Sequence, residues 1–129
     1  MNLRLPLAVV VFALLAACSP RQIHNTDERP VPLQAQTQSL ANLEKAIIEA
    51  GAPRGWVFTK AAEGHLLATY ARNNWSATVN ILFNQKTYRI TYNNSVNLKK
   101  NGDSIHYNYN RWVNNLDEDI QLKLAQLRA

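Results

Sequence analysis

Cys18 is the only cysteine among the 129 residues, and it follows directly on a run of apolar and small residues. A thiol without a second cysteine forms no disulfide within the chain and no cysteine-ligated metal site. The chemistry that remains is nucleophilic attack, because sulfur is the best nucleophile that the side chains offer for an alkyl transfer. The residues that precede Cys18 therefore decide which reaction the thiol undergoes.

The first seventeen residues have the three zones of a secretory signal peptide. A short positive start ends at Arg4, an apolar core runs over residues 5–15 with only Pro6 interrupting it, and small residues stand just before Cys18. The apolar core is shorter than the ~20 residues that a transmembrane helix needs. We therefore predict that residues 1–17 are a signal peptide.

The stretch Leu15-Ala16-Ala17-Cys18 resembles the lipobox of bacterial lipoproteins. The resemblance implies that the Cys18 thiol receives a diacylglyceryl group, that the chain is cut before it, and that the new amine is acylated. Several acyl chains make a stable membrane anchor, whereas a single chain binds only marginally. Ser19 follows where Asp would favour inner-membrane retention in enterobacteria, which implies the outer membrane with the protein facing the periplasm. The alternative is a secreted protein with a cysteine near its cleavage site.

Other catalytic side chains are few. Asp103, Ser104 and His106, or Ser95 in place of Ser104, have the residue types of a hydrolytic triad. Their closeness in the sequence does not give triad geometry, so a turn whose Asp and Ser side chains bond the backbone is the favoured interpretation.

Metal and cofactor sites are not predicted either. The other two histidines, His24 and His65, belong to no metal-binding pair, and the chain has no glycine-rich phosphate loop. The acidic run over residues 117–119 falls within a predicted helix, where neighbouring side chains point apart, so we expect a solvated face. We therefore predict a protein that is not an enzyme and has no cofactor.

Asparagine and aromatic residues are concentrated between residues 88 and 115. Flat amphipathic rings and amide groups suit stacking on sugars or gripping a peptide. The candidate ligand-binding residues are Tyr92, Asn94, Lys99, Lys100, His106, Tyr107, Tyr109, Asn110 and Arg111. The alternative is that the aromatic residues are core and that the asparagines cap a helix and stabilise turns.

Two segments in this region, TYNNSVNLK and IHYNYNRWVNNLDEDI, resemble a group of small proteobacterial envelope lipoproteins with which we associate no activity. The resemblance covers about the last third of the chain. The shared positions are Tyr88, Tyr92, Ser95, Asn97, Leu98, His106, Tyr109, Asn110 and Trp112. It implies an envelope lipoprotein and no catalytic role.

The formal net charge is +5 and becomes +4 when Arg4 leaves with the leader. This modest excess is dispersed, with Lys99 and Lys100 as the only adjacent pair. It suits anionic lipid head groups or acidic glycans, although an ordinary solvated surface explains it too. Nucleic-acid binding conflicts with export.

The segment over residues 18–38 has three prolines, many polar residues and no apolar periodicity, so we predict a lipidated cysteine followed by a flexible tether. Ser39 then caps a helix whose apolar residues recur over positions 40–50. Strands are predicted over 55–59, 65–72, 75–83 and 87–93, and on the third of them alternate residues from Trp75 to Phe83 share one face. A loop over 94–107 leads into a final helix that begins near Asn108.

These elements predict an α+β domain over residues 39–129: a four-stranded antiparallel meander with an N-terminal and a C-terminal helix packed on one face. With the leader, they predict a membrane-anchored envelope lipoprotein that binds an envelope glycan or protein without catalysing a reaction. The alternative is a structural or assembly subunit of an outer-membrane complex.

Overall fold

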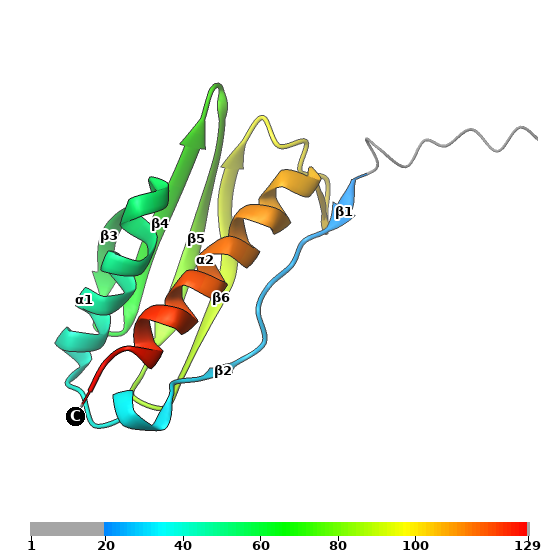
Figure 1. The fold of residues 1–129 in the computed structure, drawn as a ribbon. Coiled ribbons are helices and arrows are strands. Elements are labelled where there is room, and N and C mark those ends of the chain that lie inside the picture. The colour runs from blue at the N-terminus through cyan, green and yellow to red at the C-terminus, as the bar shows by residue number, and fades with distance from the viewer. Residues whose placement is uncertain (1–19, 129) are drawn as a thin grey trace, which may run out of the picture.

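The computed structural model describes residues 20–128, which form one open sheet with two long helices on the same side of it (Figure 1). The helices are α1 (Leu40–Gly51) and α2 (Tyr107–Ala125). The strands are β1 (Arg21–Gln22), β2 (Arg29–Pro30), β3 (Val57–Ala62), β4 (His65–Arg72), β5 (Trp75–Phe83), β6 (Thr87–Val96) and β7 (Ser104–Ile105). The predicted signal peptide (1–17) and Cys18 lie outside the described residues.

The main sheet is antiparallel and has the order β2-β6-β5-β4-β3. Strands β3 to β6 form the predicted meander, so the α+β class, the two helices and the antiparallel pairing are confirmed. The predicted count of four strands is wrong, because β2 adds a fifth strand at the β6 edge. This strand spans only two residues and includes Pro30, so it has no alternation that the sequence could reveal. Strands β1 and β7 form a separate two-stranded sheet.

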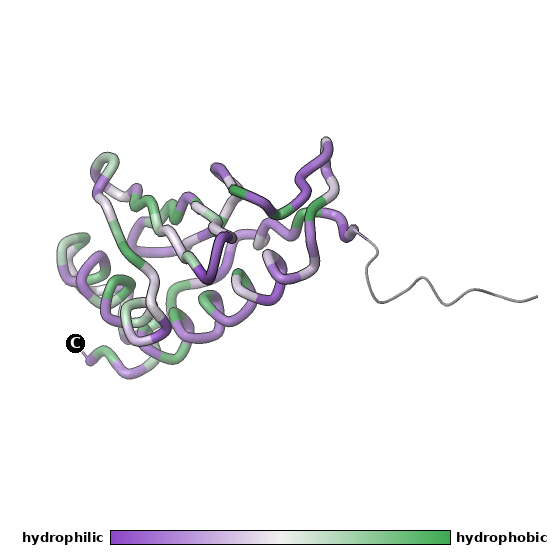
Figure 2. Tube along the Cα trace, turned by 90° about the horizontal axis from the view of Figure 1, so that it is seen from above, coloured by the Kyte–Doolittle hydropathy of each residue, from purple (hydrophilic) through white to green (hydrophobic). Residues whose placement is uncertain are grey.

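Both helices begin with side-chain caps. Ser39 Oγ accepts a hydrogen bond from the Asn42 amide at 3.1 Å, as predicted from the sequence. His106 caps α2, which begins one residue before the predicted start. In Figure 2 both helices alternate between hydrophobic and hydrophilic residues, as amphipathic helices do. No helix within residues 20–128 is long and apolar enough to span a membrane.

The core lies between the helices and one face of the sheet. Strand β5 follows the predicted alternation: its residues from Ala77 to Phe83 alternate between buried and half-buried, and Val79 and Ile81 are fully buried. The opposite face carries polar cross-strand pairs, among them Thr69 and Thr78, whose hydroxyls lie 2.8 Å apart. One layer of helices on one face of the sheet thus encloses a single core.

The N-terminal segment, residues 20–38, is bound along the sheet and is not a tether. Arg21 pairs with Ile105, and Arg29 pairs with Tyr88. Farther along, Val31 is only 2% exposed. The structure therefore corrects the flexible tether that we predicted for this part of the chain. The prediction failed because backbone pairing to the free edge of β6 holds the segment, and such pairing needs no apolar periodicity.

Thr26 and Asn25 complete this attachment. The Thr26 amide donates to the Ile90 carbonyl at 3.0 Å, and the Ile90 amide donates to Thr26 Oγ1 at 2.8 Å. The Tyr92 amide donates to Asn25 Oδ1 at 2.9 Å. Side-chain oxygens thus replace backbone carbonyls as acceptors for the β6 edge, and Thr26 is itself buried.

A buried carboxylate joins this segment to the sheet and to α2. Tyr88 Oη donates to Asp117 Oδ1 at 2.7 Å, and Arg29 Nε donates to Asp117 Oδ2 at 3.2 Å. Asp117 is 7% exposed, which corrects the prediction that residues 117–119 all lie on a solvated face. Glu118 is exposed, and Asp119 forms an ion pair with Arg54.

We expect Thr26→Val to lower the free energy of unfolding by about 1–3 kcal/mol, because the buried Ile90 amide loses its acceptor. Thr26→Ser keeps the hydroxyl and serves as the control, so it should retain most of the stability. Urea unfolding of both variants followed by circular dichroism measures the difference. Unchanged stability of Thr26→Val, together with a loss in Thr26→Ser, would show that the methyl group, and not the hydrogen bond, holds the segment.

Candidate functional site

The predicted aromatic surface over residues 92–109 is largely turned inward. Tyr109 is fully buried, and its ring meets that of Tyr92 edge-on with 5.5 Å between centroids. The Tyr92 hydroxyl lies 2.8 Å from Ser95 Oγ. Tyr109 therefore does not present its ring to a ligand, whereas Tyr92 is partly buried and lines a surface hollow with Lys100 and Asp103.

The Tyr109 hydroxyl is buried and has no hydrogen-bond partner among the described residues. Burial raises the pKa of its phenol, because the charged form would lose its hydration, and the nearby Tyr92 adds to the shift. Tyr88 is also buried, and its pKa is likewise raised, first by burial and then by its hydrogen bond to Asp117. The two phenols differ in that only Tyr88 has a partner.

Asn110 holds the N-terminal segment in place. Its Oδ1 accepts from the His24 amide at 2.8 Å, and its Nδ2 donates to the Gln22 carbonyl at 2.8 Å. Both ends of this amide are occupied by backbone groups more than eighty residues away in the sequence. Asn110 is therefore engaged in structure and is not free to bind a ligand.

His106 and its neighbours do not form a hydrolytic triad. His106 Nδ1 accepts from the Asn108 amide at 3.2 Å, so it has no hydrogen to donate to an aspartate. The Ser95 hydroxyl is bonded to that of Tyr92. The His106 ring instead stacks on Tyr107, with 4.5 Å between ring centroids. The triad considered from the sequence is therefore not assembled.

The other predicted residues are exposed. Lys100 Nζ lies 5.3 Å from the centre of the Tyr92 ring and donates to the Gly102 carbonyl at 2.9 Å. Asn94, Lys99 and Tyr107 are exposed on β6, on the loop after it and at the start of α2. The loop side chains and Tyr107 lie at the end of the molecule where β1 begins. Arg111 alone of the predicted set lines a pocket between β4 and α2.

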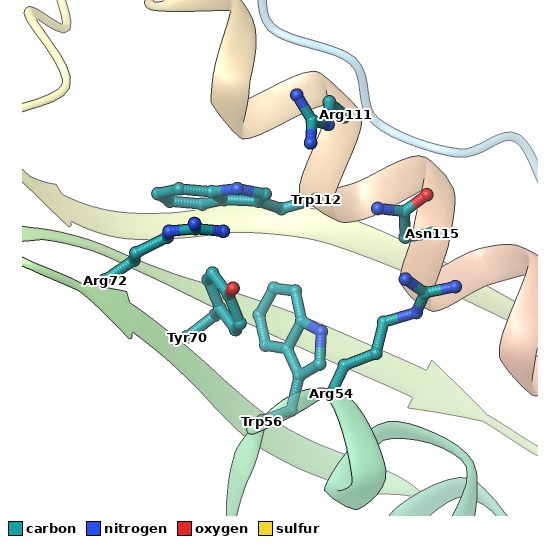
Figure 3. Close-up of a pocket in the computed structure, with 7 residues that line it drawn as sticks. All are labelled: Arg54, Trp56, Tyr70, Arg72, Arg111, Trp112 and Asn115. Carbon is teal, nitrogen blue, oxygen red and sulfur yellow. The ribbon is translucent and has the colours of Figure 1, made fainter.

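This pocket, which we call the arginine–aromatic pocket, lies between β4 and the first turns of α2 (Figure 3). Its volume is about 150 Å³. Its seven lining residues are Arg54, Trp56, Tyr70, Arg72, Arg111, Trp112 and Asn115. Three parts of the chain meet there: the turn before β3, the end of β4 and the second turn of α2.

Three aromatic rings form its floor. The Tyr70 ring lies between Trp56 and Trp112, with centroid distances of 5.4 Å and 4.8 Å. Both tryptophans are more than nine-tenths buried, and Tyr70 is partly buried. Gly55 adopts a left-handed conformation, with φ at 104°, that turns the chain between Arg54 and Trp56. This turn places the Arg54 guanidinium and the Trp56 ring at the same opening of the pocket.

The three arginines differ in their partners. Arg54 is paired with Asp119 at 2.5 Å, and the hydrogen bond to this carboxylate raises the pKa of Arg54. No acidic side chain within residues 20–128 lies at ion-pair distance from Arg72 or Arg111. In Figure 3 Arg72 approaches the rings from β4, while Arg111 projects from α2. Two guanidinium groups thus flank the aromatic floor without a carboxylate to neutralise them.

This arrangement suits a ligand in which an anionic group is attached to a flat or cyclic part of the molecule. Arginine donates paired hydrogen bonds to carboxylate and phosphate oxygens, and aromatic faces pack on rings. Within residues 20–128 no three His, Cys, Asp or Glu side chains come together to hold a metal ion. The pocket therefore offers binding by charge and packing.

The sequence contains a signal for this pocket that we did not predict. Each arginine stands one or two positions from an aromatic residue: Arg54 before Trp56, Arg72 after Tyr70, and Arg111 before Trp112. These pairs are far apart in the chain, and only the pairing of β4 with the sheet and the packing of α2 bring them together. The region over 88–115 was favoured because its residues are neighbours in the sequence.

We expect Tyr88→Phe and Tyr109→Phe to have different effects. Tyr88→Phe should lower the free energy of unfolding by about 1.5–3 kcal/mol, because it removes a hydrogen bond to a carboxylate. Tyr109→Phe should leave stability unchanged or raise it, since its hydroxyl has no partner among the described residues. Urea denaturation measures both, and an equal loss in the two variants would contradict the difference in hydrogen bonding.

The raised pKa values of the same phenols predict a dependence on pH. Folding favours the protonated phenol, so this stability is complete below the ordinary tyrosine pKa of about 10 and is lost as pH rises above it. Tyr88→Phe and Tyr109→Phe should each reduce that alkaline loss. Tyr107→Phe removes an exposed phenol and is the control; an identical pH profile in all three variants would contradict the prediction.

Comparison with known proteins identifies no relative of this chain. No protein-family model matches the sequence. No curated protein and no solved structure matches it at a significant level.

Proposed function

We propose that this protein is a lipid-anchored lipoprotein of the cell envelope that binds an acidic sugar unit of an envelope glycan in the arginine–aromatic pocket. It is anchored through Cys18 to the outer membrane, faces the periplasm and catalyses no reaction. The single observation that carries the binding role is the pair of unneutralised arginines, Arg72 and Arg111, on either side of a tryptophan–tyrosine floor.

The chemistry of the pocket supports an acidic sugar in two ways. Guanidinium groups form charge-assisted hydrogen bonds with a carboxylate, which are roughly twice as strong as neutral ones. The tilted rings of the floor offer apolar surface to the C–H groups of a sugar, while the Asn115 amide beside them can both donate hydrogen bonds to hydroxyls and accept them. The volume of about 150 Å³ limits the bound part to one small unit of a longer chain.

The net charge supports the same ligand class. Without the predicted leader the chain keeps a formal excess of four positive charges, and export would bring it among the anionic polymers of an envelope. The electrostatic field of this positive charge would attract an anionic ligand before the ligand reached the pocket. Neutral glycans would gain only the packing on the rings.

A second candidate, an assembly subunit, is favoured by the open edge of the sheet. Strand β3 pairs only with β4, and Val57 on this edge strand is 68% exposed. A partner strand adding to this edge would satisfy its free backbone groups. However, Lys60 on β3 is ion-paired with Glu44 and Glu63, and a bulge follows it. Both features protect an edge against pairing, so the pocket is the better-supported site.

We expect a glucuronate-containing oligosaccharide to shift the indole N–H resonances of Trp56 and Trp112, and a neutral glucose oligosaccharide to shift them far less. Trp75 is the cross-strand partner of Arg72, so the neutral oligosaccharide, and not the Trp75 resonance, is the control. Arg72→Gln and Arg111→Gln should each weaken binding about 10- to 100-fold, since each removes a charged hydrogen-bond donor worth about 1.5–3 kcal/mol. Two-dimensional NMR titration of the mature protein gives the affinity.

Arg89→Gln is the matched control, because Arg89 is exposed on the outer face of β6 and makes the same change of charge. It should bind the acidic oligosaccharide as the unmodified protein does. If all three arginine variants weaken binding equally, the loss of affinity results from the change in net charge and not from contacts in the pocket. The absence of any shift at Trp56 and Trp112 would reject the pocket and leave the β3 edge as the next site to test by cross-linking in cells.

A further inference from the structure

The end of the molecule where β1 begins carries a cluster of positive charge. We call it the basic end, and it comprises Arg21, Arg72, Lys99, Lys100 and Arg111, all of which are exposed. Asp103 is the one acidic side chain among the described residues of this end. The remaining acidic residues lie on the helices, at the β3–β4 turn or along the N-terminal segment farther down the β6 edge. The charge of the domain is therefore polarised toward one end.

Contacts between three parts of the chain make this end a continuous surface. Asn97 Nδ2 donates to the Asn74 carbonyl at 2.7 Å, which ties the loop after β6 to the β4–β5 turn. The His106 amide donates to the Leu98 carbonyl at 2.8 Å, which ties the same loop to the start of α2. Figure 1 shows the loop after β6 and the start of α2 next to β1. These hydrogen bonds hold the three parts together, so the positive side chains project from one continuous surface.

The backbone of this surface is unusual. Asn73, Asn97 and Lys99 are the non-glycine residues with positive φ within residues 20–128, and all three lie here. Lys99 has φ at 52°, a left-handed conformation that a long side chain rarely adopts. Such conformations persist only where the surrounding contacts fix them, and they are concentrated at functional surfaces. The fold thus maintains a costly turn that keeps two lysines exposed.

Amphipathic residues accompany the charges. Tyr107 is 43% exposed and Val96 is 52% exposed, and Trp75 is half-buried beside His106. Tyrosine and tryptophan are enriched where proteins meet the membrane–water interface, because one part of each ring is apolar and another is polar. A mixture of lysine, arginine and interfacial aromatics is typical of surfaces that bind anionic bilayers.

The length of chain between the anchor and the fold decides what this surface faces. Only Ser19 and Pro20 separate Cys18 from β1, so the three residue steps from Cys18 to Arg21 span at most about 11 Å. The N-terminal segment is bound to the sheet from Arg21 onward, so it gives no further reach. A lipid on Cys18 therefore brings the basic end against the bilayer.

We propose that the basic end docks on an anionic phospholipid surface and fixes the orientation of the domain on the membrane. The proposal rests on the proposed anchor at Cys18; the basic end shares Arg72 and Arg111 with the pocket, but the test below uses Lys99 and Lys100, which lie outside the pocket. Because α2 and the strands lead away from this end in Figure 1, docking would leave the distal end, with the β5–β6 turn, directed away from the bilayer.

The test uses the full chain, with acylation of Cys18 verified by mass spectrometry, in vesicles of phosphatidylethanolamine and phosphatidylglycerol. Acylation blocks the natural thiol, so a fluorophore attaches only to an introduced cysteine. Asn101→Cys places it at the basic end, and Gln85→Cys places it in the β5–β6 turn. Nitroxide-labelled lipids should quench the label at position 101 severalfold more than the label at position 85.

Charge reversal by Lys99→Glu with Lys100→Glu should abolish that difference, and so should vesicles of phosphatidylcholine alone. Lys45→Glu with Lys86→Glu makes the same change of charge on residues outside the basic end and should preserve it. Equal quenching of the two labels, or stronger quenching at position 85, would overturn the proposal, as would an unmodified Cys18. The indole shifts of Trp56 and Trp112 with glucuronate oligosaccharide report on the pocket separately, so failure of docking and failure of glycan binding are distinguishable.

Discussion

The pairing of the N-terminal segment with the outer edge of β6 is the interaction on which the rest of the structure depends. It closes one edge of the sheet through backbone bonds and through the oxygens of Asn25 and Thr26. It also brings Arg29 to the buried carboxylate of Asp117, which would otherwise have only Tyr88 as a partner. The edge, the buried charge and the position of α2 are therefore established by the same segment, residues 20–38.

Two neighbouring surfaces with different chemistry lie on this fold. The arginine–aromatic pocket opens between β4 and α2, where Tyr70 packs between two tryptophans. The basic end lies where the segment starts, next to the loop that carries Lys99 and Lys100. Arg72 and Arg111 belong to both, because they stand at the boundary between the pocket and that end. The proposed anionic ligand and the proposed anionic surface would thus meet neighbouring parts of one positive field.

Local patterns predicted most of the elements, and tertiary contacts decided the rest. The alternation in β5 and the Ser39 cap could be found in the sequence because each depends on residues close together in the chain. The pairing of β2 could not be found, since a two-residue strand has no period. Nor could the burial of Asp117, because it depends on Arg29, which is 88 residues away. The predicted site failed at Tyr109 and Asn110 for a related reason: aromatic and amide groups that suit a ligand also suit the interior and the backbone of their own chain.

The two hydrogen bonds of Asn110 to the backbone around β1 have a mechanical consequence. If the chain before Pro20 is pulled, the force reaches the Asn110 amide and the short β1–β7 pair first. Their hydrogen bonds would then break one after another. Sequential rupture needs less force than the simultaneous shearing of a long ladder. The first element to yield under tension would thus be the one nearest the point of pull, while the five-stranded sheet and its helices stayed intact.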